Sequence, residues 1–73
     1  MIQFWLNKAS KLGLEIALRE LRYKLTEERT NLSVLGGYYV EYDRADEILN
    51  NVKSMKDFVR AIVRIDAILA DLP

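Results

Sequence analysis

The apolar positions of residues 54–72 cover an unusually wide arc of a helical wheel. At about 100° per residue they sweep about 220°, whereas the buried stripe of a surface helix covers only about 100° or somewhat more. The members of this arc are Met55, Phe58, Val59, Ala61, Ile62, Val63, Ile65, Ile68, Leu69, Ala70 and Leu72. The pattern predicts a helix from Met55 to about Asp71 with more apolar surface than a partner of this size can cover. Ser54 followed by Asp57 resembles a capping box and supports a start at this point.

The first part of the chain, from Gln3 to about Thr30, is rich in Leu, Lys, Glu, Arg and Ala, which lose little side-chain freedom in a helix. It predicts one long helix, with Gly13 as the place where that helix could bend. Its polar stripe has an apolar flank on each side, so the helix should contact two neighbours. Because this helix is the longest, its first half should overhang the others and expose Trp5, Leu12 and Ile16.

The middle of the chain is ambiguous. Gly36 and Gly37 mark a turn between two apolar runs, which allows a short β-hairpin at residues 32–42. Apolar residues from Tyr38 to Val52 also share one face of a helical wheel, and this helical pattern is the longer of the two. We therefore expect a short helix from about Tyr39 or Asp43 to Asn51, and the hairpin stays open as the alternative.

These elements predict an all-α fold of three helices, one long, one short and one medium, in a single helical domain spanning residues 1–73. A chain of 73 residues hides only about 60% of the surface that its unfolded state exposes. Without cysteine or histidine, neither a disulfide nor the usual zinc ligands can add stability. We therefore expect a homo-oligomeric helical bundle. The residues expected to form its assembly contacts are Trp5, Leu12, Ile16, Phe58, Ile62, Ile65, Asp66 and Leu69.

Asp66 is the one charged residue inside the wide apolar arc. An unpaired carboxylate in an apolar contact is costly, so it should meet a cation or backbone donors. A role in fixing the register of the assembly is the preferred interpretation. The alternative is that Asp66 lies at the edge of the contact and reaches water.

The residue types argue against an enzyme. The chain has no histidine for general base catalysis and no cysteine nucleophile, and its serines have no recognisable triad partners. We expect no cofactor and no metal.

The net charge of zero gives no overall attraction to nucleic acid or an anionic membrane. The first cations, Lys8 and Lys11, follow the apolar start instead of preceding it as in a signal peptide, so a cytoplasmic location is expected.

A local basic stripe is the main chemical feature of the expected long helix. It contains Lys8, Lys11, Arg19, Arg22 and Arg29. Tyr38, Tyr39 and Tyr42 follow the glycine turn, and tyrosine is enriched at interfaces. The sequence predicts a small non-enzymatic interaction protein, an adaptor, regulator or inhibitor, that binds copies of itself through protein–protein contacts. Another protein could be a further partner, and no membrane partner is expected. The alternative is a module that binds nucleic acid or another anionic ligand through the stripe and the tyrosines.

Overall fold

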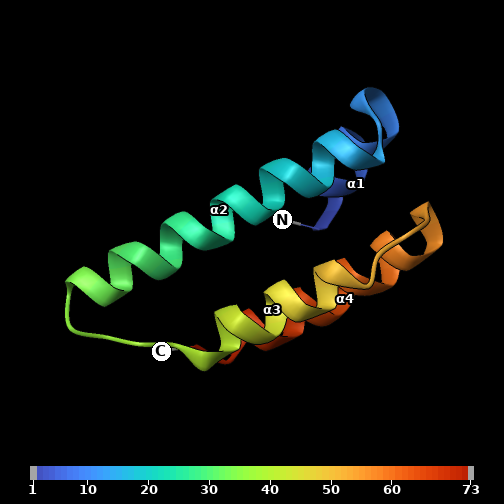
Figure 1. The fold of residues 1–73 in the computed structure, drawn as a ribbon. Coiled ribbons are helices and arrows are strands. Elements are labelled where there is room, and N and C mark those ends of the chain that lie inside the picture. Colours follow the sequence, from blue (N-terminus) through green and yellow to red (C-terminus); the bar gives the residue numbers. More distant parts are fainter. Residues whose placement is uncertain (1, 73) are drawn as a thin grey trace.

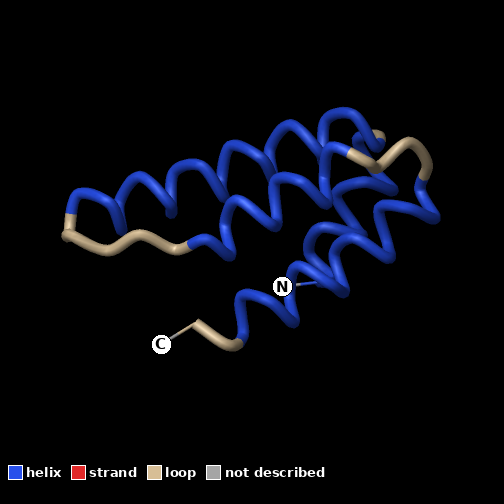
Figure 2. Tube along the Cα trace, turned by 60° about the horizontal axis from the view of Figure 1, so that its bottom comes forward, coloured by secondary structure: helices blue, strands red, loops and turns tan. Residues whose placement is uncertain are grey.

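The computed structural model describes residues 2–72, which form four helices and no strand. The helices are α1 (Ile2–Leu12), α2 (Leu14–Val34), α3 (Val40–Asn50) and α4 (Met55–Ala70). The chain reverses direction at each connection (Figure 1), and α1 and α3 each pack on both α2 and α4. The predicted all-α class is confirmed. The three-helix arrangement is wrong, and so is the alternative hairpin at residues 32–42, which hold turn and helix (Figure 2).

Gly13 divides the expected long helix into two. Its N–H donates to the carbonyl of Ala9 at 3.0 Å and its carbonyl accepts from the N–H of Ala17 at 3.2 Å, so it ends α1 and begins α2. Its φ of +102° lies in the region that glycine adopts without a steric cost. The chain therefore turns back instead of bending, and α1 packs along the first half of α2. Trp5 is consequently buried, and the predicted overhang that would expose it is wrong.

The glycine pair ends α2 in a Schellman motif. Gly36 has a φ of +88°, and its N–H donates to the carbonyl of Ser33 at 3.0 Å. The N–H of Gly37 donates to the carbonyl of Leu32 at 2.8 Å, which completes the motif. The helix expected after this turn is confirmed, because α3 ends one residue before the predicted Asn51.

The start of α4 also agrees with the sequence. The Ser54 side chain accepts a hydrogen bond from the N–H of Asp57 at 3.2 Å, as an N-cap residue should. The Asp57 carboxylate in turn accepts from the N–H of Lys53 at 3.2 Å. The helix ends at Ala70, one residue before the predicted Asp71.

The core lies where the four helices meet. Phe58 and Leu49 are its largest fully buried side chains, and Ala17 and Ala45 are small enough to let neighbouring helices approach closely. The buried members are Trp5, Ala9, Ala17, Leu21, Leu25, Tyr42, Ala45, Leu49, Phe58, Ala61, Ile62 and Ile65. No charged side chain is buried within residues 2–72.

Candidate functional site

Most of the basic stripe is engaged inside the chain. Because Gly13 reverses the chain, Lys8 lies on α1 and forms an ion pair with Glu20 of α2. The Nη2 atom of Arg22 donates to the carbonyl of Leu49 at 3.2 Å. That carbonyl belongs to the last turn of α3 and also accepts from the N–H of Val52 at 3.1 Å. The turn at Gly13 thus separates residues that one continuous helix would have aligned.

The remaining members of the stripe differ in their contacts. The Nε atom of Arg29 lies 3.2 Å from the Oδ1 atom of Asp43, an ion pair that joins α2 to α3. Lys11 and Arg19 are exposed on different helices. Neither takes part in an ion pair with residues 2–72. The stripe is therefore not a single five-cation surface, and Lys11 and Arg19 are the two members without a side-chain partner among residues 2–72.

The three tyrosines near the glycine turn also have partners inside the chain. Tyr38 is exposed, its ring lies under the guanidinium of Arg29 at 5.5 Å, and its hydroxyl donates to Asp43. Tyr39 packs edge-on against Tyr42, with 6.4 Å between ring centres. These contacts fasten the α2–α3 connection to α3. Each of the three is used, at least in part, by the fold itself.

Tyr42 is the most buried of these tyrosines, and its hydroxyl donates to the Oε2 atom of Glu28 on α2 at 3.2 Å. Burial raises the pKa of the Tyr42 phenol above its ordinary value of 10.0, and the nearby Glu28 carboxylate raises that pKa further. The phenol therefore stays protonated and holds α3 against α2 at neutral pH.

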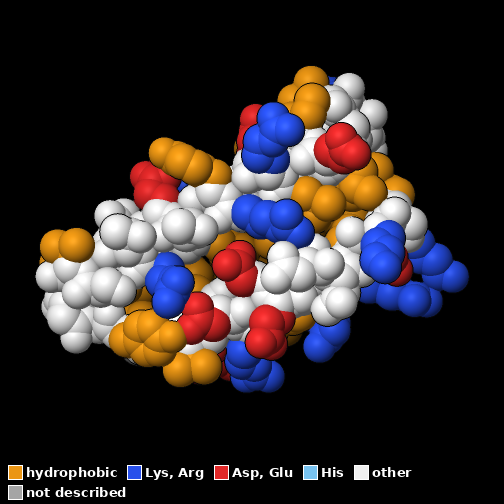
Figure 3. Space-filling view, in the orientation of Figure 1, with side chains coloured by type: hydrophobic (Ala, Val, Ile, Leu, Met, Phe, Trp, Pro, Cys, Tyr) orange, Lys and Arg blue, Asp and Glu red, His pale blue; other side chains and the backbone are white. Residues whose placement is uncertain are grey.

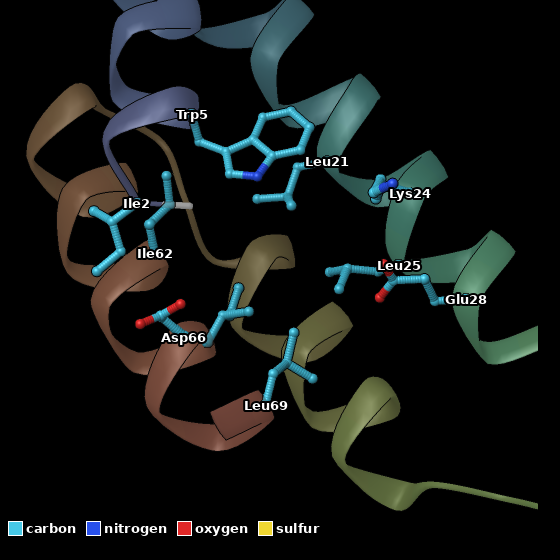
Figure 4. A pocket seen from close by; sticks show the side chains of 10 residues that line it. Ile2, Trp5, Leu21, Lys24, Leu25, Glu28, Ile62, Asp66 and Leu69 are labelled. Atoms are coloured by element: carbon cyan, nitrogen blue, oxygen red, sulfur yellow. The ribbon is translucent and has the colours of Figure 1, made fainter. Parts of the chain in front are cut away.

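A small groove lies between α2 and α4 beside the start of α1 (Figure 4). Leu21 and Leu25 of α2 form one wall, Ile62 and Leu69 of α4 form the other, and Trp5 closes one end. Its cavity volume of about 40 Å³ is far below the roughly 300 Å³ at which small-molecule sites begin. Several residues expected to make assembly contacts are used in this intramolecular packing.

The expected assembly residues divide between the interior and the surface. Trp5, Phe58, Ile62 and Ile65 are buried within one chain, Leu69 is half-buried, and Leu12 and Ile16 are exposed. The return of α1 onto α2 and α4 supplies the cover that we expected from another copy. An assembly surface must therefore be built from other apolar residues together with Leu12 and Ile16.

Asp66 stands at the rim of the groove, exposed to solvent (Figure 4). It forms no ion pair and no side-chain hydrogen bond with the other residues of the 2–72 range. Within the single chain, the interpretation that fits is the one in which the carboxylate reaches water. Its proposed role in the register of an assembly stays a prediction.

Large apolar side chains remain exposed at three places on the surface. On the outer side of the α1–α2 hairpin they are Phe4, Leu12, Ile16 and Tyr23, which we call the hairpin face. At the α2–α3 turn they are Val34, Leu35, Tyr38 and Val40, which we call the tip. On α4 they are Met55, Val59 and Val63, which we call the apolar row. The apolar row is the part of the wide arc that the fold leaves uncovered.

The sequence reasoning missed a second basic surface, beside the apolar row. Lys53, Lys56, Arg60 and Arg64, which we call the cationic row, are all exposed. Figure 3 shows Lys and Arg side chains gathered at the lower right, toward the end of the molecule where α4 begins. The spacing of four between Lys56, Arg60 and Arg64 was the available signal, because such residues share one side of a helix.

No helix in residues 2–72 is long and apolar enough to cross a membrane. In the same range, no group of three or more acidic, histidine or cysteine side chains is placed to hold a metal ion. Comparison of the chain with models of known protein families, with curated proteins and with solved structures finds no significant match.

Proposed function

We propose that this chain is a small non-enzymatic interaction protein, an adaptor, regulator or inhibitor, that associates with copies of itself through protein–protein contacts. The observation that carries the proposal is the amount of apolar surface left exposed after the core has formed. Among residues 2–72, eleven large apolar side chains are exposed, and they gather at three places. Scattered exposed apolar residues are normal in soluble proteins, whereas grouped ones mark interaction sites.

The hairpin face is the surface best suited to self-association. Phe4 is 55% exposed and Tyr23 is 72% exposed, and both line a shallow hollow between α1 and α2. Aromatic side chains contribute much of the binding energy at interfaces. A two-fold contact sets a surface against itself, so charges of one sign are unfavourable in it. Here the ion pair between Lys8 and Glu20 places both signs beside the aromatic rings.

Light scattering on the purified chain tests this proposal. The expected mass at micromolar concentration is at least twice the chain mass of 8.5 kDa. Replacing Phe4 and Tyr23 by Ser should return the mass to that of one chain. The matched control is Val34→Ser with Leu35→Ser at the tip, which removes two even more exposed apolar side chains and should leave the mass unchanged. A monomeric parent chain would contradict the proposed self-association.

The alternative function, binding of nucleic acid or another anion through the basic stripe and the tyrosines, has weaker support. Lys8, Arg22 and Arg29 are engaged with groups of the same chain. A salt titration separates the two proposals, because phosphate binding weakens steeply as salt rises. Arg19→Glu with Arg22→Glu should abolish binding of a single-stranded oligonucleotide if the alternative holds.

A further inference from the structure

We propose that the solvent face of α4 binds an acidic amphipathic helix of a partner protein, laid along the cationic row and the apolar row together. The proposal rests on the proposed role of the chain as an interaction protein, but it does not depend on self-association. Apart from Lys53, which directly precedes α4, the two rows lie side by side on one helix, so a single ligand helix can contact both.

The cationic row has a charge that the fold does not neutralise. Lys53, Lys56, Arg60 and Arg64 form no ion pair with any residue in the 2–72 range. The nearby Asp57 carboxylate accepts a hydrogen bond from a backbone N–H at the start of α4. Among the cations outside this row, Lys8 and Arg29 form ion pairs across helices, whereas Lys11 and Arg19 form none with residues 2–72.

This arrangement is unfavourable for the isolated chain. Lys56 and Arg60 are four residues apart, as are Arg60 and Arg64, and like charges at this spacing destabilise a helix. A ligand with carboxylates at matching positions would convert this repulsion into attraction. Arginine can also bind a carboxylate through two parallel hydrogen bonds.

The apolar row provides the second contact for the ligand helix, an apolar strip beside the cations. Met55, Val59 and Val63 follow one another at intervals of four, and their exposed fractions are 40%, 39% and 52%. Residues at this spacing form a continuous strip along a helix. An amphipathic helix could place its own apolar side chains on this strip while its carboxylates reach the cationic row. Asp66 borders the strip on its other side and would repel a second line of carboxylates there.

Extended polyanions fit this surface less well. Figure 3 shows the side of the molecule on which α3 lies in front of α4, and Asp and Glu side chains are spread across it. The neighbouring α3 carries the acidic residues Glu41, Asp43, Asp46 and Glu47, so a duplex or an anionic membrane wide enough to reach α3 would meet charges of its own sign. The two rows also lack an aromatic side chain on which a nucleic-acid base could stack. A narrow ligand such as one helix avoids both problems.

A second copy of this chain is also a poor occupant. A two-fold contact through α4 would set one cationic row against another. The exposed positions of α3 are Val40, Arg44, Glu47 and Asn50, which do not form an apolar strip for the apolar row. The partner is therefore a different protein with an acidic amphipathic helix. The helical part of the cationic row, from Lys56 to Arg64, spans eight residue steps, or about 12 Å of helix, so about two to three turns of ligand suffice.

The test uses a synthetic helical peptide of about 14 residues, long enough at the helical rise per residue to span the cationic row. The peptide carries Leu on one face and Glu beside it, and its binding to the full chain is followed by fluorescence anisotropy. Lys56→Glu with Arg60→Glu should weaken binding by at least about tenfold, a change of about 1.4 kcal/mol. Val59→Ser with Val63→Ser should also weaken it. The matched control, Lys11→Glu with Arg19→Glu, makes the same charge change on exposed cations of α1 and α2 and should bind like the parent.

Three results would overturn the proposal. A scrambled peptide of the same composition could bind equally well, which would mean that only net charge matters. The control variant could lose binding as much as the α4 variant. Phosphatidylserine-containing vesicles or an oligothymidine could bind α4 more tightly than the peptide, which would assign the face to a membrane or to nucleic acid.

Circular dichroism on each variant establishes that it is folded, and all substituted side chains are exposed. Peptide binding by a monomeric chain would contradict only the proposed self-association. Absence of peptide binding by a dimeric chain would contradict only the proposed partner.

Discussion

At the scale of single residues, Tyr42 shows how burial and charge together control one contact. The phenol lies between α2 and α3 and donates to Glu28, and its pKa is raised above 10.0, first by burial and then by the carboxylate. A group whose pKa is higher in the folded state stabilises that state fully below its unfolded pKa. The stabilisation is lost as the pH rises through the folded pKa.

Tyr42→Phe should therefore change the alkaline stability of the chain. At neutral pH the variant should lose about 0.5–1.5 kcal/mol of unfolding free energy, the usual contribution of one hydrogen bond. Above about pH 10 the difference should shrink and then reverse, because only the parent must bury a phenolate. Urea unfolding at a series of pH values measures this. Tyr23→Phe, at an exposed position, is the control, and an equal pH dependence in both variants would contradict the assignment to Tyr42.

Ser54 is a residue whose role the sequence predicts and the structure confirms. Its side chain accepts from the N–H of Asp57, so Ser54→Ala leaves that N–H without this acceptor. The expected loss of unfolding free energy is about 1 kcal/mol. Ser10→Ala, on the exposed side of α1, should be neutral or slightly stabilising because Ala favours helix. Equal stabilities for the two variants would show that the cap contributes nothing.

At the scale of helices, residue composition predicted α3 and α4 closely and failed at Gly13. Helix-favouring residues continue on both sides of this glycine, and a single glycine is usually tolerated inside a helix. What decides the turn is the burial gained when Trp5 and Ala9 pack against distant residues of α2 and α4. Local sequence cannot supply that information, because the contacts form only once all four helices are present.

Gly13→Ala tests the balance between the turn and a continuous helix. Alanine at the φ of +102° and ψ of 155° found here should cost about 1–3 kcal/mol, because this backbone region is essentially restricted to glycine. A built Cβ meets no other atom within 4 Å, so the cost lies in the backbone conformation and not in a clash with a neighbour. Burying a tryptophan removes about 150–250 Å² from water, which stabilises the docked helix by roughly 4–6 kcal/mol. We therefore expect the turn to survive with lower stability.

The fluorescence of Trp5, the single tryptophan, reports the outcome. Its emission should stay that of a buried indole in Gly13→Ala. Gly36→Ala provides the comparison, because its φ of +88° and open surroundings impose a similar strain far from Trp5. A red shift in the Gly13 variant alone would mean that α1 has undocked and that the helices have joined.

At the scale of the whole molecule, the excess of apolar surface was predictable and its location was not. The wide arc of α4 is real, but Phe58, Ile62 and Ile65 are used in the core, and the uncovered part is the apolar row. The wheel gives the width of an arc without saying which side of it meets the neighbouring helices. The cationic row was likewise visible in the spacing of α4, but its lack of partners follows only from the packing.

Asp66→Leu tests how this uncovered surface is kept apart from the groove. The exposed carboxylate lies between the groove, lined by Ile62 and Leu69, and the apolar row on the same helix. Replacing it with Leu would join the two into one larger apolar surface, and such surfaces promote association. We expect the fold to persist and the mean mass from light scattering to rise with concentration above that of the parent.

Asp71→Leu is the matched control for Asp66→Leu, since it removes the same charge at the exposed end of α4, away from the groove. Its mass should follow that of the parent chain at every concentration. If both variants associate equally, net charge alone limits association. If neither does, the carboxylate of Asp66 has no part in separating the surfaces. A rise in mass confined to Asp66→Leu would mean that the Asp66 carboxylate limits which apolar residues of α4 can contact another chain.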